Sequence, residues 1–132
     1  MAESPLMKRL QIKPGQKIAV IDAPEGFVEG IGHLPPGAKL VEKLEEALDF
    51  VQLFVKNSQE LESSVTAVLR ALKKDGLLWI CYPKGSSKVK TDLNRDILWK
   101  KMEKYGQAGV AMISVDAVWS AMRFRPTEKV GK

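Results

Sequence analysis

With 132 residues the chain is long enough for one domain with a hydrophobic core and too short for two. Hydrophobic residues make up 45% of it, yet no apolar run is long enough to cross a bilayer, so we expect no membrane partner. One cysteine and one histidine exclude the usual zinc sites, and we expect no metal. The unpaired Cys81, interpreted as an inert core residue, favours a cytoplasmic protein over a secreted one.

The net charge of +5 is unevenly distributed along the chain. Residues 1–83 hold 10 Lys and Arg against 11 Asp and Glu, whereas residues 84–132 hold 11 against 5. This excess of positive charge favours an anionic partner, such as a phosphate, a nucleotide or a nucleic acid. A solvated lysine-rich surface that only keeps the protein soluble explains the same asymmetry.

The first half of the chain contains three short apolar runs. Residues 17–22 form a nearly continuous apolar run, which is typical of a buried strand in a parallel sheet. Residues 27–31 could form one or two helical turns. Residues 38–44 predict a short second strand interrupted by charges, and residues 50–55 predict a buried third strand.

Helices and strands alternate in the next part of the chain. We expect a helix that Ser58 caps, that ends with Lys73 and Lys74, and that Gly76 terminates. Residues 77–82 predict the fourth strand. A polar loop then leads into a helix from about residue 92 to residue 105.

Two final apolar runs, residues 109–115 and 118–124, are joined by a tight turn near Asp116 and predict an antiparallel hairpin. Strands that alternate with helices and end in a hairpin are typical of a three-layer α/β sandwich, here with six strands. We expect residues 1–126 to form this single domain and residues 127–132 to form a flexible tail.

Three segments resemble S-adenosylmethionine-dependent methyltransferases. Residues 10–22 look like the lead-in to that family's first strand, and residues 68–80 look like its helix-to-strand turn. The final helix and hairpin, residues 93–124, are similar to the end of the same fold. The resemblance implies a truncated, methyltransferase-like domain. Its fold would be a Rossmann-like sandwich with a mostly parallel six-stranded sheet.

The family's glycine-rich cofactor turn has no counterpart in this sequence. The segment Asp22-Ala-Pro-Glu-Gly-Phe27 places Pro24 and Glu25 where glycines would let the backbone approach the cofactor. The sequence therefore assigns no cofactor, and we expect no S-adenosylmethionine in the family's usual position. Residues 21–27, 82–87 and 91–96 also resemble the signatures of a small bacterial family of unknown function, a resemblance that implies the fold and no activity.

The sheet order implied by the resemblance brings distant polar segments together. Open α/β sheets bind ligands beyond the carboxyl ends of their strands, where the strand order reverses. The first strand, ending at Asp22, and the third, ending near Lys56, would flank that point, and the fourth, ending at Tyr82, would be next to them. The candidate ligand-binding residues at this edge are Asp22, Glu25, Lys84, Gly85, Ser86, Ser87, Thr91, Asp92, Asn94 and Arg95.

The segment after Tyr82 has the composition of an anion site. Lysine ammonium groups, serine hydroxyls and the N–H groups at the start of the next helix all suit a phosphate. Lys84 and Arg95 would supply most of the affinity in a pocket beside Asp22. Alternatively, Thr91 or Asp92 only caps the helix, and Arg95 pairs with Asp22 as a structural clasp.

The sequence thus predicts a domain that binds an anionic small molecule or a nucleotide, and it leaves open whether the domain is an enzyme. The alternative is a protein-interaction module without catalytic activity. Nucleic acid is disfavoured as a partner, because the lysines are not interleaved with exposed aromatic residues and no known binding motif is present.

Overall fold

The computed structural model describes residues 9–27, 34–41, 43–44, 47–85 and 89–127. In chain order its elements are β1 (Lys17–Ile21), β2 (Lys39–Val41), β3 (Leu48–Phe54), α3 (Ser58–Ala71), β4 (Leu72–Pro83), α4 (Arg95–Glu103), β5 (Gln107–Ser114) and β6 (Trp119–Pro126).

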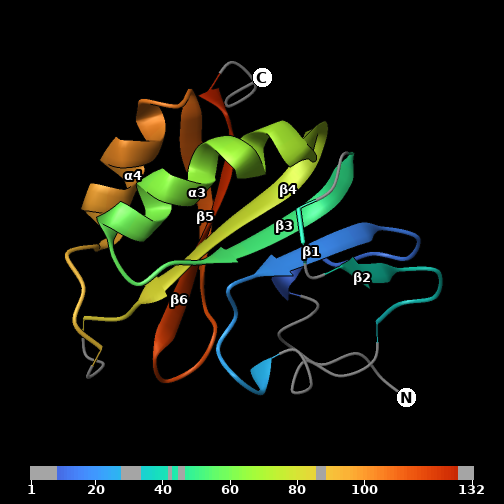
Figure 1. The fold of residues 1–132 in the computed structure, drawn as a ribbon, viewed down its shortest axis with the longest axis horizontal. Helices are drawn as coiled ribbons and strands as arrows, with labels where there is room; N and C mark the ends of the chain where they lie inside the picture. The colour runs from blue at the N-terminus through green and yellow to red at the C-terminus, as the bar shows by residue number, and fades with distance from the viewer. Residues whose placement is uncertain (1–8, 28–33, 42, 45–46, 86–88, 128–132) are drawn as a thin grey trace.

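All six strands belong to one sheet with the order β2-β1-β3-β4-β6-β5 (Figure 1). Strands β2, β1, β3 and β4 are parallel, and β6 is antiparallel to both β4 and β5. The expected mostly parallel sheet with a C-terminal antiparallel hairpin is therefore confirmed. The chain leaves β1 for β2 on one side and returns to β3 on the other, so the strand order reverses between β1 and β3.

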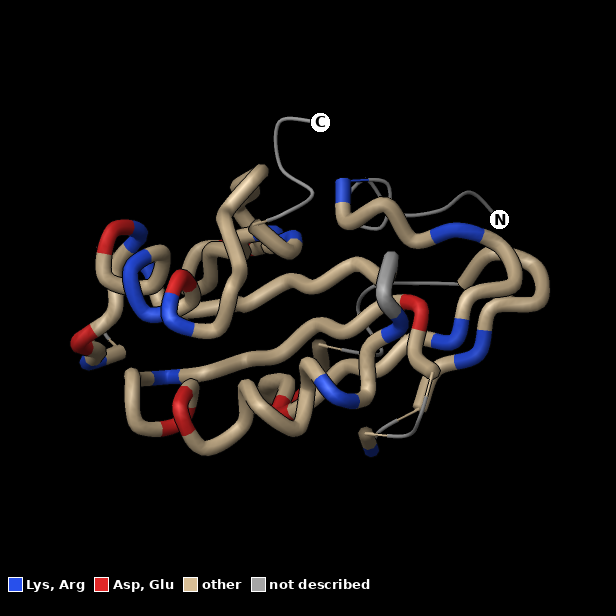
Figure 2. The backbone as a smooth tube through the Cα atoms, turned by 90° about the horizontal axis from the view of Figure 1, so that it is seen from above, with Lys and Arg blue, Asp and Glu red and all other residues tan. Residues whose placement is uncertain are grey.

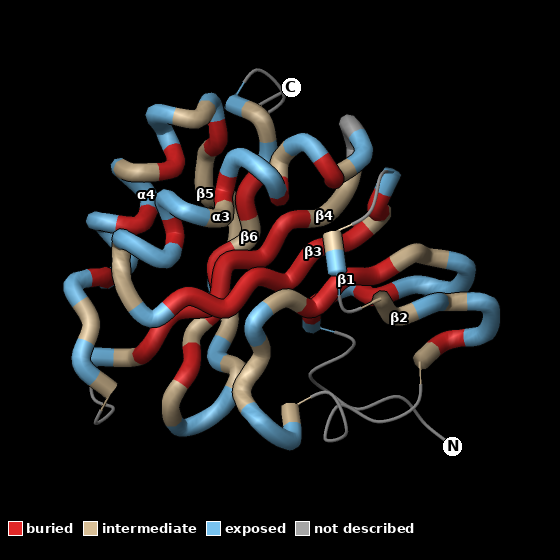
Figure 3. Tube along the Cα trace, in the orientation of Figure 1, coloured by how far each residue is buried: buried red, intermediate tan, exposed pale blue. Residues whose placement is uncertain are grey.

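Both described helices cover the same face of the sheet (Figure 1). Leu61, Val65 and Val68 of α3 pack with Leu98 and Met102 of α4 against inward-facing residues of the strands. These positions recur at spacings of three and four, which gives each helix one apolar stripe. The strands β3 and β4 run through the centre of the molecule as its most continuously buried segments (Figure 3).

Segments from the N-terminal part of the chain cover the opposite face of the sheet. Leu10 and Ile12 pack there with Phe27 and Leu34, over Trp79 of β4. The Trp79 indole Nε1 donates a hydrogen bond to the carbonyl oxygen of Leu10 at 3.0 Å. The sheet is thus covered on both faces, as an α/β sandwich requires.

The ends of α3 differ from the prediction. Asn57, not Ser58, is the N-cap, and its side chain accepts a hydrogen bond from the Glu60 N–H at 2.9 Å. The helix ends at Ala71, because Leu72 is already extended and pairs with Leu48 of β3. Residues 73–76, which the sequence predicts to be the last helical turn and its glycine terminator, therefore belong to β4.

The other boundaries agree with the prediction to within a few residues. The second strand is shorter than expected, with only Lys39–Val41 paired to β1. The predicted helical turns at residues 27–31 fall mostly outside the described residues. The same holds for the predicted tail, of which Thr127 is described and donates its N–H to the carbonyl oxygen of Gly106 at 2.8 Å.

Candidate functional site

The chain turns sharply where β1 ends at the carboxyl edge of the sheet. Asp22 has a φ of 59°, in the left-handed region that Asp tolerates better than most residues. A turn follows in which the Phe27 N–H donates to the carbonyl oxygen of Pro24 at 3.1 Å, with Gly26 at a φ of 82°. That positive φ is what the third position of a type II turn requires. A non-glycine residue thus makes the first bend of a turn that the resemblance would build from glycines.

A pocket of about 360 Å³ lies between Asp22 and the first turns of α3. The described residues that line it all have polar side chains, and they are Asp22, Asn57, Gln59, Glu60, Ser63 and Ser64. The Asp22 carboxylate is exposed and makes no hydrogen bond or ion pair with another described residue. The pocket therefore offers two carboxylates with amides and hydroxyls, at the point where the strand order reverses.

Asp92 ties the loop after β4 to the start of α3. Its carboxylate accepts one hydrogen bond from the Ser58 N–H at 2.8 Å and a second from the Ser58 hydroxyl. These bonds from Ser58 hold the pKa of Asp92 below its ordinary value of 3.8. The negative charge also lies at the positive end of the helix dipole. The anion-binding position at the start of α3 is thus occupied by a carboxylate of the chain itself.

The hydrogen bonds that the Asp92 carboxylate accepts from Ser58 should make the free energy of unfolding depend on pH in the acid range. The folded pKa of Asp92 is lowered, so its contribution is fully present above the unfolded pKa and is lost as the pH falls through the folded one. Between about pH 5 and about pH 2, the free energy of unfolding should therefore fall more steeply in the wild type than in Asp92→Asn. Urea unfolding at a series of pH values measures both slopes, with the exposed Glu25→Gln as control. Equal slopes for the wild type and Asp92→Asn would show that the hydrogen bonds between Asp92 and Ser58 are not formed in solution.

Lys84 lies on the other side of this edge, beside the hairpin. Its ammonium group donates to the Ser114 hydroxyl at the end of β5 at 2.6 Å, and its N–H donates to the carbonyl oxygen of Val118 at 2.7 Å. Gly85 follows it in an exposed turn, and Ser86 and Ser87 lie outside the described residues. The structure therefore places Lys84 with β5 and β6.

The remaining predicted site residues surround the start of α4. Asn94, rather than Thr91 or Asp92, is the N-cap, and its side chain accepts from the Ile97 N–H at 2.9 Å. The predicted cap was wrong because both side chains have other partners. The Asp92 carboxylate accepts from the Ser58 N–H, and the Thr91 hydroxyl accepts from the Leu93 N–H at 3.0 Å.

Arg95 pairs with Asp96, with its Nε 3.5 Å from the carboxylate, and not with Asp22 as one alternative proposed. Glu25 is exposed in the turn after β1 and does not line the pocket. Among the described residues, the structure thus brings only Asp22 of the predicted set into the pocket beside α3.

Charge at the surface is mixed. Acidic and basic positions follow one another closely along α4, whereas α3 has Glu60 in its first turn and Arg70 in its last (Figure 2). In the described part of the chain, no three His, Cys, Asp or Glu side chains are placed to hold a metal ion. No helix among those residues is long and apolar enough to span a membrane.

Cys81 is fully buried in β4 and accepts a contact from the Gln52 amide nitrogen at 3.3 Å. Burial raises the pKa of its thiol to about 12. We therefore expect no reaction of the folded protein with a thiol reagent near neutral pH, where a few per cent of an exposed thiol is ionised. Ellman's reagent should titrate one thiol only after denaturant is added. Rapid modification of the native protein would contradict the buried position of the thiol.

Comparisons of the structure identify the fold. A SAM-dependent methyltransferase from Aquifex aeolicus superposes with a TM-score of 0.67 at 14% identity, over 90% of this chain and 86% of that one. DhpI in complex with SAH gives a TM-score of 0.60 at 10% identity, over 91% and 81%. A TehB-like SAM-dependent methyltransferase from Corynebacterium glutamicum gives 0.57 at 15% identity, over 92% and 85%.

The chain therefore has the Rossmann-like fold of SAM-dependent methyltransferases. No protein-family model and no curated protein sequence matches it. The resemblance to a small bacterial family, and the truncation of the fold, stay predictions.

Proposed function

We propose that this domain binds a small molecule of the nucleoside or nucleotide class at the carboxyl edge of its sheet, between the end of β1 and the start of α3. The observation that supports this most is the polar pocket of about 360 Å³ at the point where the strand order reverses. Open α/β sheets bind their ligands at this place.

The chemistry of the pocket suits the sugar of a nucleoside. The carboxylates of Asp22 and Glu60 accept hydrogen bonds and donate none, and a ribose presents two neighbouring hydroxyl donors. The Gln59 amide both donates and accepts, which suits the edge of a base, whereas the Ser63 hydroxyl donates to the Gln59 carbonyl oxygen at 2.8 Å and is left as an acceptor. Two carboxylates disfavour a phosphate in the same place, because like charges repel.

The phosphate of a nucleotide would therefore point away from Asp22 and toward the end of β4. Only β3 separates β1 from β4, so the two strands run about 10 Å apart, and β4 continues three residues past Ile80, which lies level with Ile21 at the end of β1. Lys84, Gly85 and the following Ser86 and Ser87 are the proposed phosphate contacts. In this arrangement the predicted anion site and the pocket beside Asp22 hold different parts of one ligand.

Calorimetric titration with adenosine and with AMP tests the proposal. Asp22→Asn keeps the shape of the side chain and its tolerance of the left-handed backbone, and removes the charge. Since a hydrogen bond to a charged group is worth about 1.5–3 kcal/mol, adenosine affinity should fall about ten- to hundredfold.

Two further variants separate the parts of the proposed ligand site. Glu25→Gln, on the same turn but outside the pocket, should leave adenosine binding unchanged. Lys84→Ala should weaken AMP and leave adenosine unchanged. The proposal fails if neither compound binds the wild type, or if Asp22→Asn binds adenosine as the wild type does.

S-adenosylmethionine is expected to bind no more tightly than adenosine. Its methionine part would need free backbone N–H groups after β1. Here Pro24 has no N–H, and the Phe27 N–H is used within the turn. Competition between the two compounds in the same titration measures the difference. Tenfold tighter binding of S-adenosylmethionine would show that the turn does accept the cofactor.

A further inference from the structure

Exposed apolar side chains occur on α4 and β5, and none of them lines the pocket beside Asp22. Among the described residues, the large hydrophobic side chains with substantial exposure are Ile97 at 38%, Trp99 at 40% and Met112 at 49%. All three belong to α4 or β5. Ile97 lies on the far side of α4, whereas Trp99 and Met112 line one groove and form the candidate interaction surface.

The strand β5 is an edge of the sheet and pairs only with β6 in the described part of the chain. Its sequence, Gln107-Ala-Gly-Val-Ala-Met-Ile-Ser114, contains no charged residue and no proline. Edge strands usually carry such residues, because unpaired N–H and C=O groups otherwise pair with another strand. This uncharged strand of eight residues has one register shift, between Gly109 and Ala111, and its edge carries no charge or proline to oppose pairing.

A groove of about 260 Å³ runs between α4 and this strand. Arg95 and Trp99 line it from the helix, and residues from Gly109 to Met112 line it from β5. A Cβ atom on Gly109 would lie 2.9 Å from the Met122 sulfur of β6 and 3.3 Å from Cε3 of the Trp99 ring, so the glycine makes room for both side chains. The ring thus lies against the middle of the edge strand.

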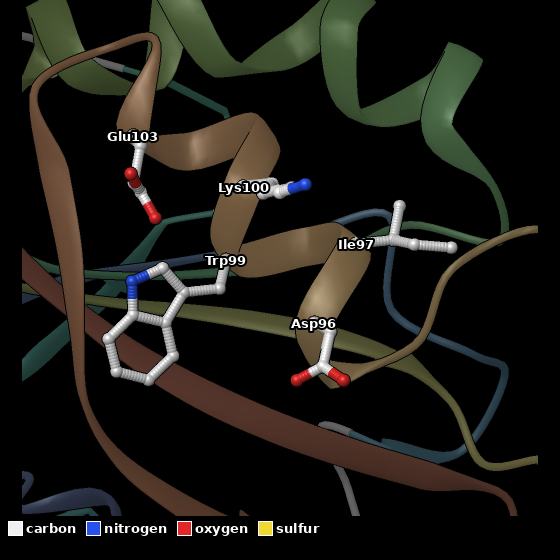
Figure 4. A pocket seen from close by; sticks show the side chains of 5 residues that line it. All are labelled: Asp96, Ile97, Trp99, Lys100 and Glu103. Carbon is white, nitrogen blue, oxygen red and sulfur yellow. The ribbon is translucent and has the colours of Figure 1, made fainter.

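One row of side chains on α4 is directed toward this edge. Trp99 and Glu103 lie on one side of the helix, and Ile97 and Lys100 point to the other (Figure 4). Arg95 shares the groove with Trp99, and a spacing of four residues places Arg95, Trp99 and Glu103 in line. Along the helix this row therefore presents the positive charge of Arg95, then the Trp99 ring, then the negative charge of Glu103. The pair of Arg95 with Asp96 is well exposed, at 64% and 86%, and so holds Arg95 only weakly.

We propose that the β5 edge and this row of α4 bind a second copy of the chain in a twofold dimer. Two β5 strands then pair antiparallel, and the two α4 helices lie side by side in opposite directions. Reversal of direction places Arg95 opposite Glu103 of the second copy, with the two Trp99 rings at the axis. Because Trp99 lies against Gly109, the axis of the helices and that of the strands coincide. This self-complementary charge favours a copy over an unrelated partner.

Sedimentation equilibrium of the intact protein, with and without exchanged charges, tests the dimer. The wild type should sediment at about twice 14.7 kDa in the micromolar range. Arg95→Glu and Glu103→Arg, each alone, place like charges opposite each other and should weaken dimerisation at least tenfold. The double variant R95E/E103R should restore it, because both copies then carry the exchanged pair.

Met112→Lys should weaken the dimer, and Ile97→Lys, a similarly exposed position on the far side of α4, should not. Circular dichroism melting shows that each variant is folded. A monomeric wild type at about 100 µM would overturn the proposal. Failure of the double variant to recover would overturn it too, and would point to a different partner. Since the surface does not include Asp22, these results are independent of nucleoside binding.

Discussion

Replacement of Trp79 by alanine is expected to lower the free energy of unfolding by about 3–5 kcal/mol. The side chain is fully buried in the middle of β4, where it packs with Leu10 and Phe50. Truncation removes a large apolar surface and leaves a cavity. It also removes the indole donor that binds the Leu10 carbonyl at 3.0 Å, which ties the N-terminal segment to the sheet.

Urea unfolding followed by circular dichroism measures this loss, and Ile97→Ala, outside the proposed dimer surface, is the control. The Ile97 side chain is 38% exposed, so its truncation should cost far less. Trp79→Phe separates the two contributions, since it keeps most of the volume and removes the donor. A loss below about 1 kcal/mol for Trp79→Ala would contradict the buried position of this residue.

Gln52→Met is expected to raise the free energy of unfolding by about 1–2 kcal/mol. Gln52 lies fully buried in the central strand β3, and its amide nitrogen contacts the Cys81 sulfur at 3.3 Å. Its Oε1 has no hydrogen-bond partner in the described part of the chain. A buried acceptor without a partner is costly, and a flexible apolar side chain of similar length removes that cost.

Urea unfolding of Gln52→Met, compared with the exposed Gln59→Met, measures the gain. The control should change stability by no more than about 0.5 kcal/mol. A clear loss of stability in Gln52→Met would mean that Oε1 has a partner in the native protein. A polar side chain in the middle of the sheet would then serve an interaction that the described residues do not supply.

The sequence carries enough information for the strands and their directions. Apolar runs such as residues 50–55 have the composition of buried parallel strands, and two runs around Asp116 predict the hairpin that forms. The ends of the helices are harder to predict from the sequence, because they depend on contacts with other elements. Lys73 and Gly76 look like a helix terminus, yet pairing of Leu72 with Leu48 begins the strand earlier.

The candidate site could be predicted only in part. Asp22 is recognisable as the residue that ends the first strand, which places it at the edge where ligands bind. The polar residues of α3 that complete the pocket look like an ordinary solvated helix face. The hydrogen bonds of Asp92 to Ser58 and of Lys84 to Ser114 join residues more than 25 positions apart in sequence. No local sequence pattern encodes these hydrogen bonds. The sequence therefore predicts Lys84 beside Asp22, whereas the structure places Lys84 with β5 and β6.

An NMR titration of the 15N-labelled protein with adenosine tests the proposed ligand site most directly. Amide shifts should be confined to the end of β1 and the start of α3, at Asp22, Gln59, Glu60 and Ser63. The polar pocket at the opposite edge, beside the Lys73–Asp49 ion pair of 2.8 Å, should stay unchanged. Saturable shifts at the first set support a nucleoside site where the strand order reverses. Shifts only at the opposite edge, or none at millimolar adenosine, would contradict it.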